Sequence, residues 1–180
     1  MLLITVPETE LFDEERQRFV TVPAKELRLE HSLVSLQKWE SKWKKPFLGK
    51  DPMTYEQTVD YIRCMTITQC VNPLVYRCLT NDNIEKVKEY INDPMTATWF
   101  SKKQKPGGSG SAITAEIIYY QMIALEIPQE YRTWHLNQLL TLIRVCGEKQ
   151  NPGKKMSRRE LANRNRSLNA ARRARLGTHG

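Results

Sequence analysis

Long hydrophobic runs and catalytic signatures are both missing from this 180-residue sequence. No segment approaches the roughly 18 apolar residues that a membrane-spanning helix needs. The first eight residues turn acidic without a basic stretch, which does not fit a signal peptide, so we expect a cytosolic protein with no membrane contact. The sequence also has no P-loop, no GxSxG or HExxH motif, and no GxGxxG after a predicted strand. These absences indicate a protein that is not an enzyme, with no catalytic residues and no cofactor.

Cysteine and histidine are scarce, and neither is arranged as metal ligands usually are. No two cysteines form a CxxC pair, so we expect reduced thiols without a metal or redox role; they are Cys64, Cys70, Cys78 and Cys146. We expect the histidines to be structural or surface residues, with one of them on the polar side of an apolar helix; they are His31, His135 and His179. The sequence therefore predicts no metal site.

Acidic residues are nearly absent from the last 28 positions, and this is the most informative feature of the charge distribution. The segment 153–180 holds nine lysines and arginines and a single acid, Glu160, so it accounts for the whole net charge of +8. Residues 1–152 are electrically balanced. A neutral domain with a cationic tail is therefore predicted, rather than a uniformly basic protein.

The body has the patterning of a mostly helical domain. Short β-favouring runs at 2–6, 19–22 and 27–30 predict a small N-terminal sheet, with 8–18 as a loop or a turn of helix. Helices are expected from Ser32 to Trp43, from a capping box at Thr54 to about Ile67, over 73–79, and from a cap at Asp82 to Asn92. Pro46 and Pro94 close two of these elements.

The most apolar part of the chain comprises residues 113–125 and 128–147. In 113–125 apolar side chains cover most of the helix circumference, which predicts a buried central helix. Pro128 fits the first turn of the next helix, and Gly147 its C-terminal end. In the tail, a capping box at Ser157 and Glu160 begins a helix that nothing interrupts before Leu176.

The predicted fold class is thus mostly α. It consists of a helical globular domain, 1–152, with a small N-terminal β element, 1–31, and a basic helical tail, 153–180. The tail has too few large apolar residues to pack on a core, so we expect it to stand free of the body.

Two groups of residues are candidates for partner binding. Tryptophans form either core or interface, and the four are Trp39, Trp43, Trp99 and Trp134. The tail supplies an electrostatic handle, made of Arg158, Arg159, Arg172, Arg173 and Arg175. These arginines could neutralise nucleic-acid phosphates, fold onto an acidic protein, or only keep the chain soluble. No motif of a known DNA-binding class accompanies them.

Four segments resemble a group of proteins encoded in the tail-gene clusters of long-tailed bacteriophages. They are residues 31–43 (HSLVSLQKWESKW), 94–100 (PMTATWF), 134–143 (WHLNQLLTLI) and the tail from 156 to 177. The resemblance covers most of the chain. It implies a role in tail morphogenesis, most often that of a tail assembly chaperone, and it supplies no catalytic residues.

As a chaperone, the chain would act in the host cytoplasm. It would bind the long helical tape-measure protein through an apolar or aromatic groove, and tail tube protein would displace it. Two alternatives stay open. In the first, the chain is a structural virion component, such as a tail or head–tail joining protein. In the second, it is a nucleic-acid-binding protein that acts through its tail. The sequence leaves homo-oligomerisation open as well.

Overall fold

The computed structural model describes residues 1–13, 17–49, 51–98, 100, 112–150 and 158–177. The chain divides into two compact units, residues 1–145 and 146–180, which are described separately. The predicted class is confirmed at the level of a mostly helical protein with a small N-terminal β element. Among the helices in the described ranges, none is long and apolar enough to cross a membrane.

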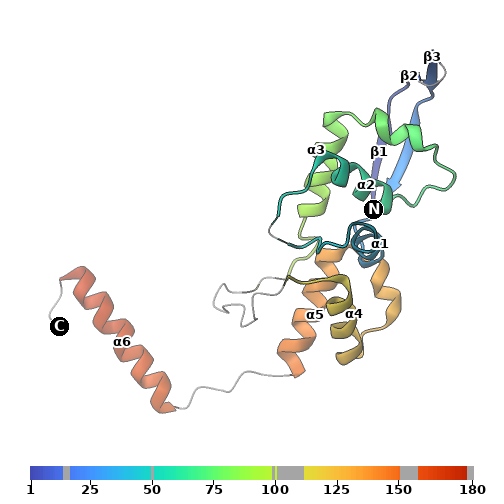
Figure 1. The fold of residues 1–180 in the computed structure, drawn as a ribbon. Coiled ribbons are helices and arrows are strands. Elements are labelled where there is room, and N and C mark those ends of the chain that lie inside the picture. Colours follow the sequence, from blue (N-terminus) through green and yellow to red (C-terminus); the bar gives the residue numbers. More distant parts are fainter. Residues whose placement is uncertain (14–16, 50, 99, 101–111, 151–157, 178–180) are drawn as a thin grey trace. The chain divides into compact units, whose positions relative to one another are not determined.

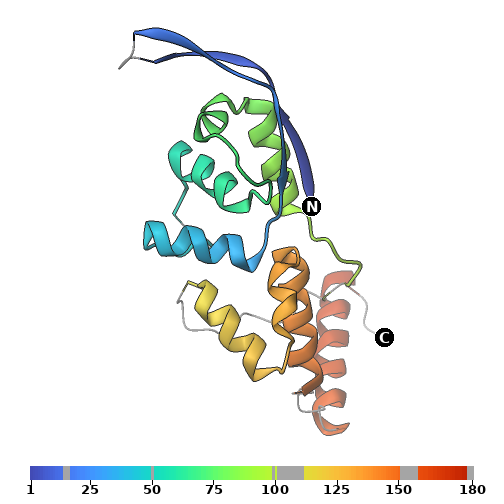
Figure 2. The same ribbon diagram turned by 90° about the vertical axis from the view of Figure 1, so that its right-hand side faces the viewer.

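The β element is an antiparallel ribbon that extends beyond the helices (Figures 1 and 2). Strand β1 (Leu2–Val6) pairs with β4 (Lys25–Leu29), and β2 (Thr9–Asp13) pairs with β3 (Arg18–Val22). Both pairs share one register, because Leu2 lies opposite Leu29 and Thr9 opposite Val22. The ribbon is divided in two at Pro7 and Pro23, which have no N–H to donate to a ladder.

The prediction of a loop or helical turn at 8–18 was wrong for the part that forms β2. Charged residues surround Leu11 and Phe12, so this segment does not look like a strand in the sequence. In the structure Leu11 pairs with Val20 across the ribbon, and Phe12 pairs with Phe19. Cross-strand pairs of this kind stabilise a ribbon, and they can be recognised only when the partner strand is known.

The first helical group packs on the inner part of the ribbon and contains α1 (Leu33–Trp43), α2 (Tyr55–Met65), η1 (Pro73–Cys78) and α3 (Asn81–Asn92). The capping box at Thr54 begins α2, as expected, and α1 begins at the expected position with a second capping box at Ser32. Thr80, not Asp82, caps α3, and its side chain accepts from Asn83 N. The core includes the fully buried side chains Val6, Leu27, Leu29 and Ile62.

The second helical group contains α4 (Ala115–Ala124), η2 (Gln129–Thr133) and α5 (Leu136–Gln150). It lies on the other side of α1 from α2 and α3 (Figure 2). The single helix predicted for 128–147 was wrong in both bounds. Its first turn is the separate 3-10 helix η2, and α5 continues through Gly147 to Gln150.

The second unit contains α6 (Arg158–Leu176), which lies in the segment for which the sequence predicts a basic helical tail. The proposed cap at Ser157 lies outside the described residues. The units divide at Val145 and Cys146, within α5. The domain boundary expected after residue 152 stays a prediction, because it lies outside the described residues.

Candidate partner-binding surface

Helix α4 is held by a carboxylate from another helix. Thr114 precedes α4 but makes no capping bond with its side chain. Instead the buried Glu40 of α1 accepts a hydrogen bond from Ala115 N at Oε2, over 2.8 Å. Its other oxygen, Oε1, accepts from Phe47 N over 2.8 Å. A negative charge at a helix N-terminus is favourable, so Glu40 serves as the N-cap of α4 from a distance in sequence.

The side of α4 that faces α1 contains Ala115, Ile118 and Met122, all buried. Tyr119 adds a hydrogen bond from its hydroxyl to Gln37 Oε1, over 3.1 Å. One face of this apolar helix is thereby used for packing inside the protein.

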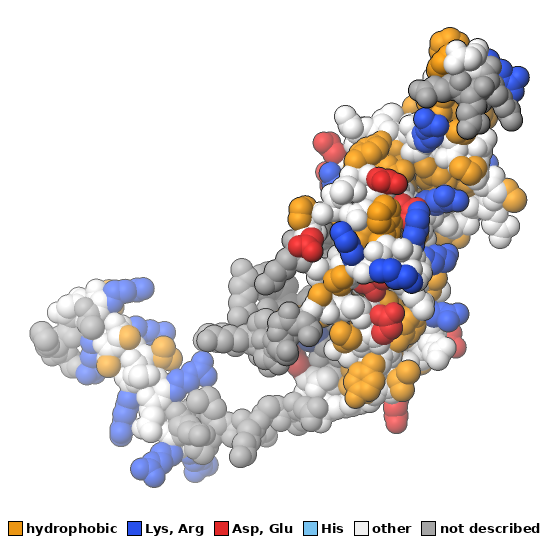
Figure 3. Space-filling model, in the orientation of Figure 1, with side chains coloured by type: hydrophobic (Ala, Val, Ile, Leu, Met, Phe, Trp, Pro, Cys, Tyr) orange, Lys and Arg blue, Asp and Glu red, His pale blue; other side chains and the backbone are white. Residues whose placement is uncertain are grey.

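The opposite side of α4 is apolar and open to solvent. Tyr120 and Ile123 are each 70% exposed, and Ile113 and Ile117 are also exposed. Ile117, Tyr120 and Ile123 lie along one side of α4 by their spacing, and Ile113 stands just before the helix. We call these four exposed side chains the α4 face. Apolar side chains are visible at the surface in this part of the body (Figure 3). The prediction of a buried central helix was therefore wrong: only about half of the apolar circumference has a partner within the described residues.

Acidic groups lie on the α4 face and just after it. Glu116 lies in the first turn of α4 and is exposed, and Glu126 and Glu130 follow the helix and are also exposed. Hydrogen bonds from its own backbone N–H and from Thr114 lower the pKa of Glu116, which therefore stays ionised at neutral pH. The face thus suits a partner that presents an apolar stripe with cationic residues beside it.

The tryptophans expected to anchor a partner do not form one surface. Trp39 is only 2% exposed, and its Nε1 donates to Gln57 O over 3.0 Å, so it is a core residue. Trp43 is half-buried and donates to Asp60 Oδ2 over 2.9 Å. Trp134 is 37% exposed and stacks on Tyr131. Trp99 lies outside the described residues.

The arginines expected to form the electrostatic handle are all on α6. Their side chains are exposed, and the set comprises Arg158, Arg159, Arg172, Arg173 and Arg175. The structure therefore brings the predicted arginines together on one helix, which it does not do for the tryptophans.

The outer end of the ribbon carries a second exposed apolar group. Phe12 and Phe19 face each other across the strands with ring centroids 5.2 Å apart in an edge-to-face arrangement. Such a pair contributes about 0.5–1.5 kcal/mol beyond its buried area. These rings therefore have a local role in holding β2 and β3 together, a role that the exposed α4 side chains lack.

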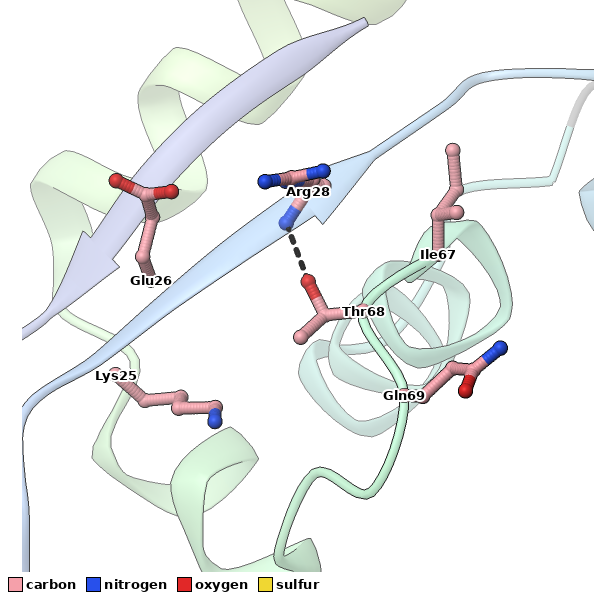
Figure 4. Close-up of a pocket in the computed structure, with 6 residues that line it drawn as sticks. All are labelled: Lys25, Glu26, Arg28, Ile67, Thr68 and Gln69. Atoms are coloured by element: carbon pink, nitrogen blue, oxygen red, sulfur yellow. Dashed lines mark hydrogen bonds between the residues drawn. The ribbon is translucent and has the colours of Figure 1, made fainter.

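One hollow of the body lies beside β4 (Figure 4). It has a volume of about 450 Å³ and is lined by Lys25, Glu26, Arg28, Ile67, Thr68 and Gln69. Part of its wall is the segment with Ile67 and Thr68, which follows α2 and lies beside β4. Arg28 N donates a hydrogen bond to Thr68 Oγ1 over 2.9 Å, and Ile67 N donates one to Arg28 O over 2.8 Å. The hollow combines two cations, one acid and an exposed apolar side chain, and contains no nucleophile placed against a general base.

Two histidines join the helical groups in the interior. His31 and His135 have ring centroids 5.1 Å apart, and His31 Nδ1 lies 2.6 Å from Tyr61 Oη. His135 donates from Nε2 to Tyr90 O over 3.0 Å and accepts from Asn137 N at Nδ1 over 3.3 Å. Burial and the neighbouring His135 lower the pKa of His31 to about 3, and burial lowers the pKa of His135. Both are thus neutral structural residues, and the prediction of His135 on a polar helix side was wrong.

The thiols differ in exposure and acidity. Cys64 borders a hollow with Asp60, and burial together with that carboxylate raises its pKa to about 11. Cys70 is exposed. Because the thiolate is the reactive form and Cys70 is the more exposed thiol, we expect an alkylating reagent to modify Cys70 faster than Cys64 near neutral pH. Mass spectrometry of the labelled peptides would measure both rates. Equal rates would contradict this expectation, and Cys64→Ser should leave the rate at Cys70 unchanged.

No significant match exists between this chain and any family model, curated protein or solved structure compared with it. The site therefore has to be assessed from its own geometry.

Sequence reasoning missed the residues that define this surface. Tyr120 and Ile123 lie in a segment read as core because its apolar residues surround the helix. No sequence pattern marks Glu40 as a helix cap, because the group that it binds, Ala115 N, lies 75 positions further along the chain. Among the described residues, no cluster of three or more histidine, cysteine or acidic side chains could hold a metal ion.

Proposed function

We propose that this chain is a non-enzymatic bacteriophage tail morphogenesis protein, a tail assembly chaperone that binds the tape-measure protein through the α4 face. The observation that carries the proposal is the exposed α4 face, with Ile117, Tyr120 and Ile123 on a helix whose other side is buried and Ile113 just before that helix. Contiguous apolar patches on soluble proteins mark interaction sites. The resemblance of four segments to tail-cluster proteins supplies the identity of the partner.

The geometry suits recognition of an amphipathic helix. The α4 face presents side chains at helical spacing, so an apolar stripe of a second helix could lie against it with its cationic residues near Glu116 and Glu126. A tape-measure protein is a long helical chain with such stripes. Covering one stripe before the tube forms would prevent its self-association, and an open surface of modest size would allow tube subunits to displace the chaperone.

Tyr120→Gln combined with Ile123→Gln should weaken this binding about 30-fold. Each side chain is 70% exposed, so the exchange removes partner contacts worth roughly 1 kcal/mol apiece and leaves the core intact. Glutamine favours a helix, so α4 should persist. Binding to the tape-measure protein of the same phage would be measured after co-expression, as its soluble fraction and as the dissociation constant of the purified pair.

A matched control removes two exposed aromatic side chains elsewhere. Phe12→Gln with Phe19→Gln lowers surface hydrophobicity on the ribbon and should leave tape-measure binding unchanged. Unaltered binding by the α4 variant would overturn the proposal. So would a stable dimer of this chain that the α4 variant dissociates, because a second copy would then cover the face. Detection of the chain in purified virions would favour the structural alternative instead.

A further inference from the structure

Helix α6 is the most strongly charged element that the structure describes, and the proposed function does not use it. Its sequence from 158 to 176 contains seven arginines, no lysine and one acid, Glu160. Arginine side chains cover its surface in Figure 3, and those of Arg159, Arg166 and Arg173 are exposed. The two large apolar side chains described on it, Leu168 and Leu176, are also exposed.

The arginines are ordered along the helix. Arg159, Arg166 and Arg173 are seven residues apart, which places them on one line with a rise of about 10 Å from each to the next. Arg158, Arg172 and Arg175 form a second, broader group, which spreads over about 100° of the circumference and is centred roughly a third of a turn away. Between the line and this group lie the short neutral side chains of Ala162 and Asn169. Positive charge is therefore presented on two flanks of a slim helix rather than on one face.

A groove with negative charge on both walls fits this arrangement better than a flat acidic surface does. The major groove of B-form DNA is about 12 Å wide and admits one α-helix, whose flanks then face the two phosphate backbones. Guanidinium groups bind phosphate oxygens through two parallel hydrogen bonds, which lysine cannot do. A lipid surface would instead require a continuous apolar face with aromatic residues, and α6 has none among its described side chains.

We propose that α6 is a duplex-DNA-binding helix that lies in the major groove and holds the phosphates of one wall through the line of Arg159, Arg166 and Arg173 and those of the other wall through the broader group of arginines. Most of the contacts are to phosphate, so binding depends weakly on base sequence and strongly on salt. This activity belongs to the second unit and is independent of the α4 face.

The test uses the full chain and a fluorescent DNA duplex of about 30 base pairs. Binding should weaken steeply with salt, because each phosphate contact adds about 0.9 to the slope of log K against log salt concentration. Arg159→Gln, Arg166→Gln and Arg173→Gln together should lower that slope by about 2 to 3 and weaken binding about 100-fold near 0.1 M salt. Glutamine and arginine have similar helix propensities, so circular dichroism should be unchanged.

A charge-matched control removes three cations from the body. Lys25→Gln, Arg77→Gln and Lys88→Gln change exposed side chains and lower the net charge by the same amount, and this variant should bind within about threefold of the parent. Equal losses in the two variants would overturn the proposal, since net charge alone would then explain binding. Absence of DNA binding would overturn it too. Tighter binding to polyglutamate would assign α6 to an acidic protein, and preference for duplex RNA would exclude the major-groove geometry.

Discussion

Glu40→Ala should lower the free energy of unfolding by about 4 kcal/mol. The substitution leaves Ala115 N and Phe47 N without their acceptor, and an unsatisfied buried donor costs roughly 1–3 kcal/mol. It also removes a negative charge from the N-terminus of α4 and leaves a small cavity beneath the helix. Urea denaturation followed by tryptophan fluorescence would measure the change.

Two further substitutions would show that the loss of unfolding free energy comes from the Glu40 carboxylate at the N-terminus of α4. Glu40→Gln keeps one oxygen acceptor, so its cost should be about half as large. Glu116→Gln removes an exposed carboxylate from the first turn of α4 and should cost less than about 1 kcal/mol. A Glu40→Ala protein that unfolds within 1 kcal/mol of the parent would contradict the role given to this carboxylate.

Acid should destabilise the body chiefly through its buried histidines. Because the folded-state pKa of His31 is about 3, against 6.5 for a free imidazole, the unfolded chain binds more protons between these values. Stability is therefore complete above about pH 6.5 and falls as the pH is lowered toward 3. By pH 4 the loss from His31 alone reaches about 3 kcal/mol, and the lowered pKa of His135 acts in the same direction.

The structural reason for the acid effect is specific. His135 accepts a hydrogen bond from Asn137 N at Nδ1 and donates from Nε2 to Tyr90 O, so an added proton would abolish the first bond. The ring of His31 lies beside it, and a charge on either imidazole would disfavour one on the other. Since Leu136 N donates to His31 O over 2.7 Å, protonation would weaken the junction between β4, α1 and α5.

Unfolding free energies at a series of pH values would test this. His31→Gln should flatten the dependence between pH 6.5 and 4. Tyr61→Phe removes the hydroxyl beside His31 but keeps the imidazole buried, so its pH dependence should stay close to that of the parent. If the parent and His31→Gln lose stability in parallel, carboxylates rather than histidines cause the acid response.

The local elements were largely predictable because their signals lie within a few residues. The cap at Thr54 with Gln57 begins α2 as expected, and the boundaries of α1 follow from Ser32 and from the residues after Trp43. Three of the four strands coincide with β-favouring runs. The fourth, β2, was missed because its charged neighbours concealed the pairing of Phe12 with Phe19.

The sequence by itself determined the helical class, the N-terminal β element and the concentration of arginines on one C-terminal helix, since these depend on propensity, capping and charge along the chain. The tertiary structure decided which apolar surfaces are covered. In the apolar pattern of residues 113–125, Tyr120 and Ile118 are equally plausible core residues, yet in the structure Ile118 is buried and Tyr120 is exposed. Glu40 and His135 likewise acquire their roles from backbone groups 75 and 45 positions away in the sequence. Burial and hydrogen bonding across such separations are properties of how elements pack, and no local pattern encodes them.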